Sequence, residues 1–244
     1  GAFVTPMMVG LLGRLNISWR YSVLTLSVLS IILLIVFLMM KVPAQKKDET
    51  TGKPVKPPFT NIRYYIFMAL LFLYVGTENS INGWLTTYLD KLGVMTRIAP
   101  QDILSIFWVA IILGRLMSAG ISKYLSREVL ILIFCIGGGI FYILFILTQN
   151  PILIAIWVFT LGLFFAGTYP TVVANASSII HGSGSASGIM LSFGGMGGAF
   201  FPYINGLIAD AKGLYAGMIA IVVSAILLII TAFVNLYLGR KTSS

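Results

Sequence analysis

An acidic residue, Glu78, lies deep inside the long apolar run of residues 64–89. It stands about 14 residues into the run, which is roughly 20 Å along an α-helix. That depth corresponds to the middle of a lipid bilayer, where a carboxylate is costly and is retained beside a partner or a water-filled cavity. We therefore predict that Glu78 belongs to a functional site and binds a proton or cation. The alternative interpretation is a structural carboxyl that is hydrogen-bonded to a neighbouring helix.

Helical spacing places further polar residues beside this carboxylate. Tyr74, Glu78 and Asn82 share one face of the predicted helix, and Asn79 lies at its margin. Amide side chains both donate and accept hydrogen bonds, and an aromatic ring offers a flat surface to a cyclic ligand. We expect this face to line a polar cavity that binds a small molecule. Trp108, by contrast, is interpreted as a packing or lipid-facing residue.

A second polar group comes late in the apolar run 151–174. It contains Thr168 and Tyr169, followed by Pro170 and, six residues after Tyr169, Asn175. Buried hydroxyl groups need partners, and a proline loosens a helix so that backbone carbonyls become free to bind a ligand. These side chains are therefore candidates for substrate binding, although they equally well satisfy one another.

Other chemistries find little support in the sequence. We identify no metal-binding cluster, no nucleophile beside a base and no phosphate-binding loop, so we expect neither an enzyme nor a bound cofactor. The glycine-rich run 194–198 lies inside an apolar segment with no strand before it. Its spacing favours close packing of two helices over nucleotide binding.

Composition indicates the elements that hold these residues. Of the 244 residues, 58% are hydrophobic and 9% are charged, and the mean hydropathy is +0.98. Such a chain belongs in a membrane, and its long continuous apolar runs predict an all-α integral membrane protein. We predict membrane spans near residues 21–42, 64–89, 102–122, 129–149, 151–174, 187–209 and 214–238.

The basic residues are distributed unevenly over the loops. If successive loops alternate across the membrane, eleven lysines and arginines fall on one side and five on the other. The excess marks the cytoplasmic side, so we expect a multi-pass protein of the inner or plasma membrane with a cytoplasmic C-terminus. Topology accounts for the net charge of +9, and we expect no nucleic-acid partner.

A repeated pattern predicts how the helices are grouped. Residues 1–21 and 198–215 share a Gly-Ala-Phe triplet, a proline and a Gly-Leu pair at similar spacing. A duplicated helix pair of this kind is typical of transporters built from two repeated bundles. We predict the end of a first bundle at residues 1–42, a cytoplasmic linker at 43–60 and a six-helix bundle at 61–244. The rest of the first bundle is expected upstream and is required for transport.

The chain resembles the major facilitator superfamily, from the end of helix 5 through helices 6 to 12. Gly114-Arg115 through Lys123 is similar to the cytoplasmic signature between helices 8 and 9. The resemblance implies that these residues help to lock one conformation. For Arg115, the residues themselves allow either a side chain that reaches the membrane surface or one that pairs with a carboxylate.

Other motifs resemble the fucose-galactose-glucose proton symporters. Tyr74-Val75-Gly76-Thr77-Glu78 is similar to their helix 7, and Tyr169-Pro170-Thr171 is similar to their helix 10. The family implies two bundles that rock about a central site lined by these helices. Because the coupling carboxylates of the fucose permease lie in its first bundle, the resemblance does not assign the coupling proton to Glu78, which remains our candidate from the residues.

The expected function is proton-coupled symport of a sugar or similar small polar solute, by a protein that is monomeric when complete. An exporter of drug-like or lipid-like compounds is an alternative, because abundant aromatic residues and ten methionines also suit an apolar cavity. A membrane scaffold or sensor that retains the fold without transport is a third possibility.

Overall fold

The computed structural model describes residues 11, 12, 15, 18, 20–40, 58–95, 98–180 and 183–243. All regular secondary structure in these ranges is helical, which confirms the all-α class. The chain divides into two compact units, Gly1–Lys56 and Pro57–Ser244. The repeat copy in residues 1–10 lies outside the described residues. So does most of the predicted linker, and therefore both remain predictions.

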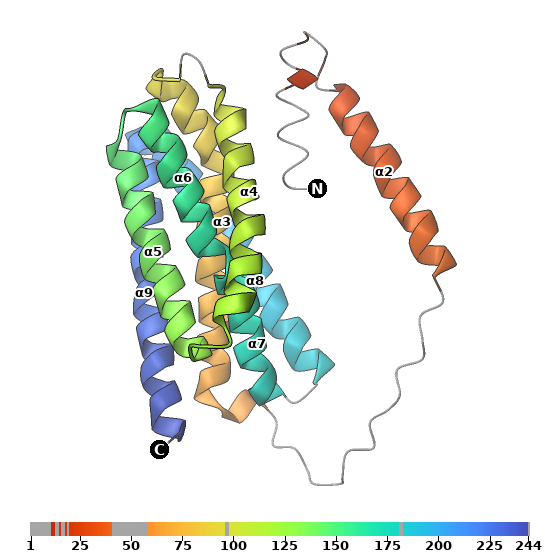
Figure 1. Ribbon diagram of the computed structural model, residues 1–244, viewed down its shortest axis with the longest axis vertical. Coiled ribbons are helices and arrows are strands. Elements are labelled where there is room, and N and C mark those ends of the chain that lie inside the picture. Colours follow the sequence, from red (N-terminus) through yellow and green to blue (C-terminus); the bar gives the residue numbers. More distant parts are fainter. Residues whose placement is uncertain are drawn as a thin grey trace. The chain divides into compact units, whose positions relative to one another are not determined.

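The first unit contains one long described helix, α2 (Arg20–Met39). The second begins with a short 3-10 helix, η1 (Pro58–Thr60), and continues as a helical bundle (Figure 1). The helices of the bundle are α3 (Ile62–Leu92), α4 (Pro100–Ile121), α5 (Arg127–Leu147), α6 (Pro151–Ala166), α7 (Thr168–Ile180), α8 (Gly184–Lys212) and α9 (Leu214–Ser243).

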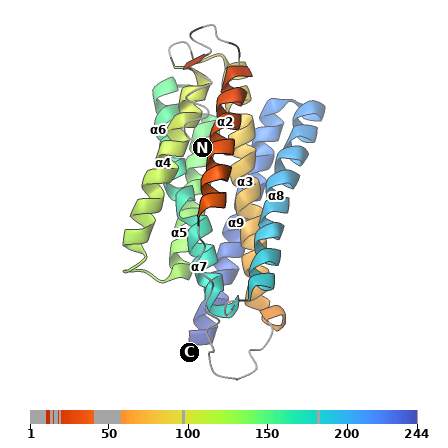
Figure 2. The ribbon, with the colours of Figure 1, turned by 90° about the vertical axis from the view of Figure 1, so that its right-hand side faces the viewer.

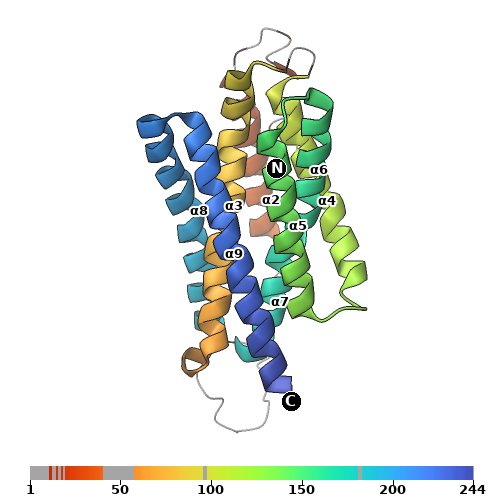
Figure 3. The same ribbon diagram turned by 90° about the vertical axis from the view of Figure 1, so that its left-hand side faces the viewer.

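The bundle helices alternate in direction, except that α7 continues α6 along the same path (Figure 1). Consequently the beginning of α3, the α4–α5 loop and the C-terminal part of α9 meet at one end, here called the α4–α5 end. The turn between α8 and α9 marks the opposite end. Figures 2 and 3 show α3 within the bundle, with α8 and α9 on one side and α4 and α6 on the other.

Local sequence signals explain where several helices begin and end. Asn150 accepts hydrogen bonds from the backbone N–H groups of Ile152 and Leu153, and Pro151 occupies the first turn of α6. Both features favour helix initiation because the first N–H groups lack partners within the helix. At the far end of α3, Gly93 adopts a left-handed conformation with φ of 69° and stops the helix.

Four of the described helical segments are long and apolar enough to cross a membrane. They are Pro100–Ile121, Arg127–Leu147, Pro151–Ile180 and Leu214–Lys241. The remaining long helices of the bundle, α3 with 31 residues and α8 with 29, have sufficient length but a more polar composition. Because α3 lies inside the bundle, its polar groups find partners on neighbouring helices.

The glycine-rich run of α8 permits a close approach to α3. A Cβ atom added at Gly197 would overlap the backbone of Phe72, lying 2.7 Å from its carbonyl carbon and 2.9 Å from its Cα. From the other side, a Cβ added at Gly76 would lie 2.9 Å from the Gly197 carbonyl oxygen. The run is therefore a packing surface, as predicted, and small residues let the two backbones touch.

The predicted span 151–174 is interrupted. α6 ends at Ala166 and α7 begins at Thr168, with Gly167 between them. Pro170 lacks the N–H group that would bond the Ala166 carbonyl in a continuous helix. The backbone N–H of Thr171 bonds the Gly167 carbonyl at 3.2 Å and restores the helical pattern. The break lies next to the polar face of α3.

Candidate functional site

Tyr74 and Glu78 form the centre of the candidate site. The side chain of Tyr74 is buried, and its Oη lies 2.9 Å from Glu78 Oε1 and 2.9 Å from the carbonyl oxygen of Phe165 in α6. The ring of Tyr74 also lies 6.4 Å from that of Tyr169 in α7, measured between centroids. The structure therefore brings three of the predicted site residues together, on α3 and beside the break between α6 and α7.

Asn82 extends this polar face by one helical turn. Its side-chain oxygen accepts a hydrogen bond of 3.1 Å from the indole N–H of Trp108 in α4. Trp108 is partly buried, and the bond fixes the orientation of the Asn82 amide. The interpretation of Trp108 as a packing or lipid-facing residue missed this polar role, because the partner lies 26 residues away in sequence.

Asn79 lies on the α8 side of α3. Its side-chain nitrogen donates to the Gly198 carbonyl at 3.3 Å, and the residue is exposed. On the same side, the indole N–H of Trp84 donates to the carbonyl of Pro202, also at 3.3 Å. Asn79 therefore connects two helices, while its side chain remains accessible at the margin of the site, where the helical spacing predicts it.

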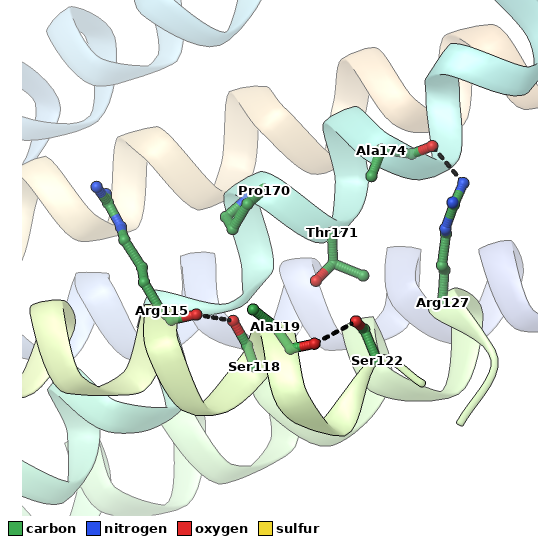
Figure 4. Close-up of a pocket in the computed structure, with 8 residues that line it drawn as sticks. All are labelled: Arg115, Ser118, Ala119, Ser122, Arg127, Pro170, Thr171 and Ala174. Atoms are coloured by element: carbon green, nitrogen blue, oxygen red, sulfur yellow. Dashed lines mark hydrogen bonds between the residues drawn. The ribbon is translucent and has the colours of Figure 1, made fainter. Parts of the chain in front are cut away.

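A cavity of about 280 Å³ lies between α4 and α7, towards the α4–α5 end (Figure 4). Arg115 lines one end of it and Arg127 lines the other (Figure 4). Arg127 donates to the Ala174 carbonyl. Arg115 is near enough to Glu78 and Tyr74 to interact with both electrostatically. The cavity wall therefore connects to the polar cluster through Arg115.

The other residues of the predicted conformational lock lie elsewhere. A Cβ atom added at Gly114 would lie 2.5 Å from the Leu163 carbonyl oxygen, so this glycine permits close contact between α4 and α6. Lys123 is exposed just beyond the end of α4. No carboxylate pairs with Arg115 or Lys123 within the part of the chain that the structure describes, so the lock remains a prediction.

Two of the predicted substrate-binding residues lie away from this cluster. Thr168 is fully buried beside the thiol of Cys135 in α5, and its hydroxyl oxygen has no hydrogen-bond partner among the described residues. Asn175 lies further along α7, where its side-chain nitrogen donates to Glu128 Oε1 at 3.2 Å. Neither side chain is brought to Glu78, and their contribution to substrate binding stays a prediction.

Asn175 belongs to a cluster that the sequence did not indicate. Glu128, in the first turn of α5, forms an ion pair with Arg63 near the start of α3, with 2.7 Å between Oε1 and Nη2. The guanidinium of Arg63 also lies 5.6 Å from the ring centroid of Phe67. These contacts join α3, α5 and α7 at the α4–α5 end. The sequence offered one signal for this cluster, namely that Glu128 is an acidic residue at the edge of an apolar run. It did not identify the partners of Glu128.

The cluster around Glu78 combines a carboxyl, a guanidinium, a phenol and amides on a partly accessible surface. Such groups bind a proton and the hydroxyl groups of a polar ligand. Within the described residues, no group of three His, Cys, Asp or Glu side chains is placed to hold a metal ion. The groups around Glu78 can hold a polar ligand through hydrogen bonds.

Comparison with known proteins identifies relatives of this chain. The family model described as Major Facilitator Superfamily matches residues 1–202. The chain is 29% identical over 205 residues to a protein from Brucella abortus biovar 1 (strain 9-941) named "Glucose/galactose transporter", covering 80% of this chain and 48% of that protein. It is 26% identical over 189 residues to a "Putative glucose/galactose transporter" from Helicobacter pylori (strain J99), covering 77% of this chain and 46% of that protein.

A mouse protein is also similar, namely "Major facilitator superfamily domain-containing protein 4A" from Mus musculus, with 28% identity over 137 residues, 56% of this chain and 27% of that protein. The chain thus spans about half the length, or less, of these relatives.

Among solved structures, the fold matches the transporter FucP in its outward conformation, with a TM-score of 0.64 and 12% sequence identity. The match covers 89% of this chain and 54% of FucP, and it supports the fold alone. Because the matching family consists of transporters, the expectation of a transporter rather than an enzyme is confirmed. The chain belongs to the major facilitator superfamily.

Proposed function

We propose that the complete protein is a proton-coupled symporter of a sugar or a similar small polar solute. Glu78 takes up and releases the coupling proton, and the face of α3 that carries Tyr74 and Asn82 forms one wall of the substrate site. The observation that carries this proposal is the Tyr74–Glu78 hydrogen bond near the middle of a long helix. A carboxyl at that depth indicates function by default.

The nature of the substrate is inferred from two sources. The relatives from Brucella abortus and Helicobacter pylori carry the names glucose/galactose transporter and putative glucose/galactose transporter, which supports a hexose. The hydrogen bond between Trp108 and Asn82 holds an amide in place beside an indole ring. Amides bind sugar hydroxyls, and aromatic rings stack on the apolar face of a sugar ring.

Transport requires a second wall. Because the chain spans about half the length of its glucose/galactose transporter relatives, a further bundle supplies that wall, and the two bundles expose the site alternately to each side of the membrane. The complete transporter acts as a monomer. Gly114, Arg115 and Lys123 help to hold one of its conformations.

The α4–α5 end of the bundle faces the cytoplasm of a cell bounded by the inner or plasma membrane. Basic residues are concentrated there, namely Arg63, Lys123, Arg127, Arg240 and Lys241. The opposite end carries Lys91 and Lys212 among the described residues. The positive-inside rule then gives a cytoplasmic C-terminus.

The proposal is tested with the complete protein in proteoliposomes, using a panel of radiolabelled hexoses. Glu78→Gln is expected to abolish accumulation driven by a pH gradient but to leave counterflow exchange, because exchange needs no net proton movement. Asp90→Asn is the matched control, since Asp90 is an exposed carboxylate on the same helix and should not affect accumulation.

Each alternative predicts a different result. Intact accumulation by Glu78→Gln would refute the coupling role. Transport of hydrophobic cations in place of hexoses would indicate an exporter. Absence of any flux in the unmodified protein would leave the membrane scaffold or sensor as the remaining alternative.

A further inference from the structure

The hydroxyl group of Tyr74 lies between two acceptors but has a single proton. Its oxygen is 2.9 Å from Glu78 Oε1 and 2.9 Å from the Phe165 carbonyl oxygen. A carbonyl oxygen only accepts, so the Tyr74 proton must be donated if that bond is to form. Both bonds therefore exist together only when Glu78 is protonated and donates its own proton to Tyr74 Oη. An ionised Glu78 competes with the carbonyl for one proton.

The Phe165 carbonyl is a sensitive position, because it belongs to the last turn of α6 immediately before the break. There Pro170 cannot supply a backbone donor, so the helix is held less tightly by its own hydrogen bonds. Tyr74 contacts both sides of the break, since its ring lies 5.6 Å from the Phe165 ring and 6.4 Å from the Tyr169 ring. Its hydroxyl ties α3 to the end of α6.

We propose that Tyr74 is a positioning residue that transmits the protonation state of Glu78 to the α6–α7 break. When Glu78 is protonated, Tyr74 donates to the Phe165 carbonyl and α6 is tied to α3. When Glu78 is ionised, the charge-assisted bond to the carboxylate is the stronger one, so the proton of Tyr74 turns towards Glu78 and the carbonyl is released. Loss of the proton from Glu78 thus loosens the break.

Few other charged or titratable groups act on this pair. From α4, Arg115 interacts with both Glu78 and Tyr74, and it balances the charge of the ionised carboxylate. From α5, the buried thiol of Cys135 interacts electrostatically with Tyr74. From α7, Tyr169 contributes its ring. On the described parts of α8 and α9, no charged group interacts with Glu78 or Tyr74.

This inference deepens the proposed function and rests on it only where it concerns coupling. In an alternating-access transporter, one bundle rocks or gates against the other around the substrate site. A tie between α3 and the α6–α7 break that exists in one protonation state makes the freedom of α7 to move depend on the proton. The proton would then control movement of α7 without contacting the substrate.

Hydrogen exchange tests the tie directly. The complete protein in lipid nanodiscs, without substrate, is exchanged across a pH series, and deuterium uptake is followed in peptides covering residues 163–173. Peptides covering residues 136–146 of α5 from the same digest correct for the intrinsic pH dependence of exchange. Loss of one intramolecular hydrogen bond should accelerate exchange at the break by about fivefold.

Three variants distinguish the tied and released states. Glu78→Gln keeps a donor that bonds Tyr74, so exchange at the break should be slow at every pH. Tyr74→Phe removes the hydroxyl but keeps the ring, so exchange should be fast at every pH. Tyr142→Phe is the matched control, because Tyr142 is equally buried and donates to the Met218 carbonyl at 3.0 Å without a carboxylate nearby. It should keep the pH dependence of the unmodified protein.

The inference is overturned if the unmodified protein shows no corrected pH dependence at the break, or if Tyr74→Phe or Glu78→Gln retains that dependence. Because Glu78→Gln preserves the packing, it decides the question even if Tyr74→Phe does not fold. The measurement needs no substrate. A protein that moves no hexose therefore refutes the proposed function alone, whereas normal proton-driven uptake with pH-independent exchange refutes the tie alone.

Discussion

Replacement of Gly197 by alanine should destabilise the bundle at the contact between α3 and α8. The added methyl group would overlap the carbonyl group of Phe72, and the contacting atoms are backbone, which cannot rotate away. The two helices must separate by roughly an ångström to reach an ordinary van der Waals distance. Overpacking of this kind costs about 1–3 kcal/mol. In a chain of this size, that corresponds to a fall of about 2–12 °C in melting temperature.

Gly195→Ala provides a matched control two residues away. A Cβ atom at Gly195 meets no atom within 4 Å, so the same substitution in the same helix adds no overlap. Alanine is favoured over glycine in a helix by about 1 kcal/mol, and the melting temperature should stay constant or rise. Both variants are compared in one detergent by thermal unfolding, together with the fraction of protein that stays monodisperse after heating. Equal melting temperatures for the two variants would refute the packing argument.

Two further predictions concern the α4–α5 end and the helix break. Glu128→Gln should lower the melting temperature, because Arg63 and Glu128 are only 15% and 19% exposed and the change leaves a poorly solvated guanidinium, at a cost of about 1–3 kcal/mol. Replacing both residues by apolar ones should cost less stability than the single change. An equal or larger loss of stability in the double variant would contradict this account. Pro170→Ala restores a backbone donor for the Ala166 carbonyl, so it should raise the melting temperature and slow hexose uptake in proteoliposomes. Faster uptake by this variant would show that the break does not assist transport.

The sequence was sufficient to predict the polar face of α3. Tyr74, Glu78 and Asn82 lie within two turns of one helix, so their common orientation follows from the helical repeat alone. The neighbours across the helix contacts were not predictable in this way. Trp108 reaches Asn82 from 26 residues away, and Asn175 reaches Glu128 from 47 residues away. Such pairs depend on how the helices pack, which a single sequence does not encode in its periodicity.

The helical repeat explains why the second predicted group separated. Thr168 and Asn175 lie seven residues apart on α7 and share one face of it, whereas Tyr169 points about 100° away from that face. Tyr169 contacts Tyr74, whereas Thr168 lies beside Cys135 and Asn175 bonds Glu128. Which neighbouring helices these faces meet depends on how the bundle packs, and the sequence did not indicate it. The polar face of α3 was accessible from sequence, and the partners of α7 were not.

Cys135 is the only cysteine in the chain, and it is buried with 1% of its surface exposed. A thiol that solvent does not reach reacts slowly with water-soluble maleimides and methanethiosulfonates. Probes can therefore be attached to cysteines introduced elsewhere in this segment without first removing the native one. Gly195, whose added side chain meets open space, offers such an attachment point on α8. Spin labels or fluorophores placed there would report the movement of α8, with Cys135 contributing little background labelling.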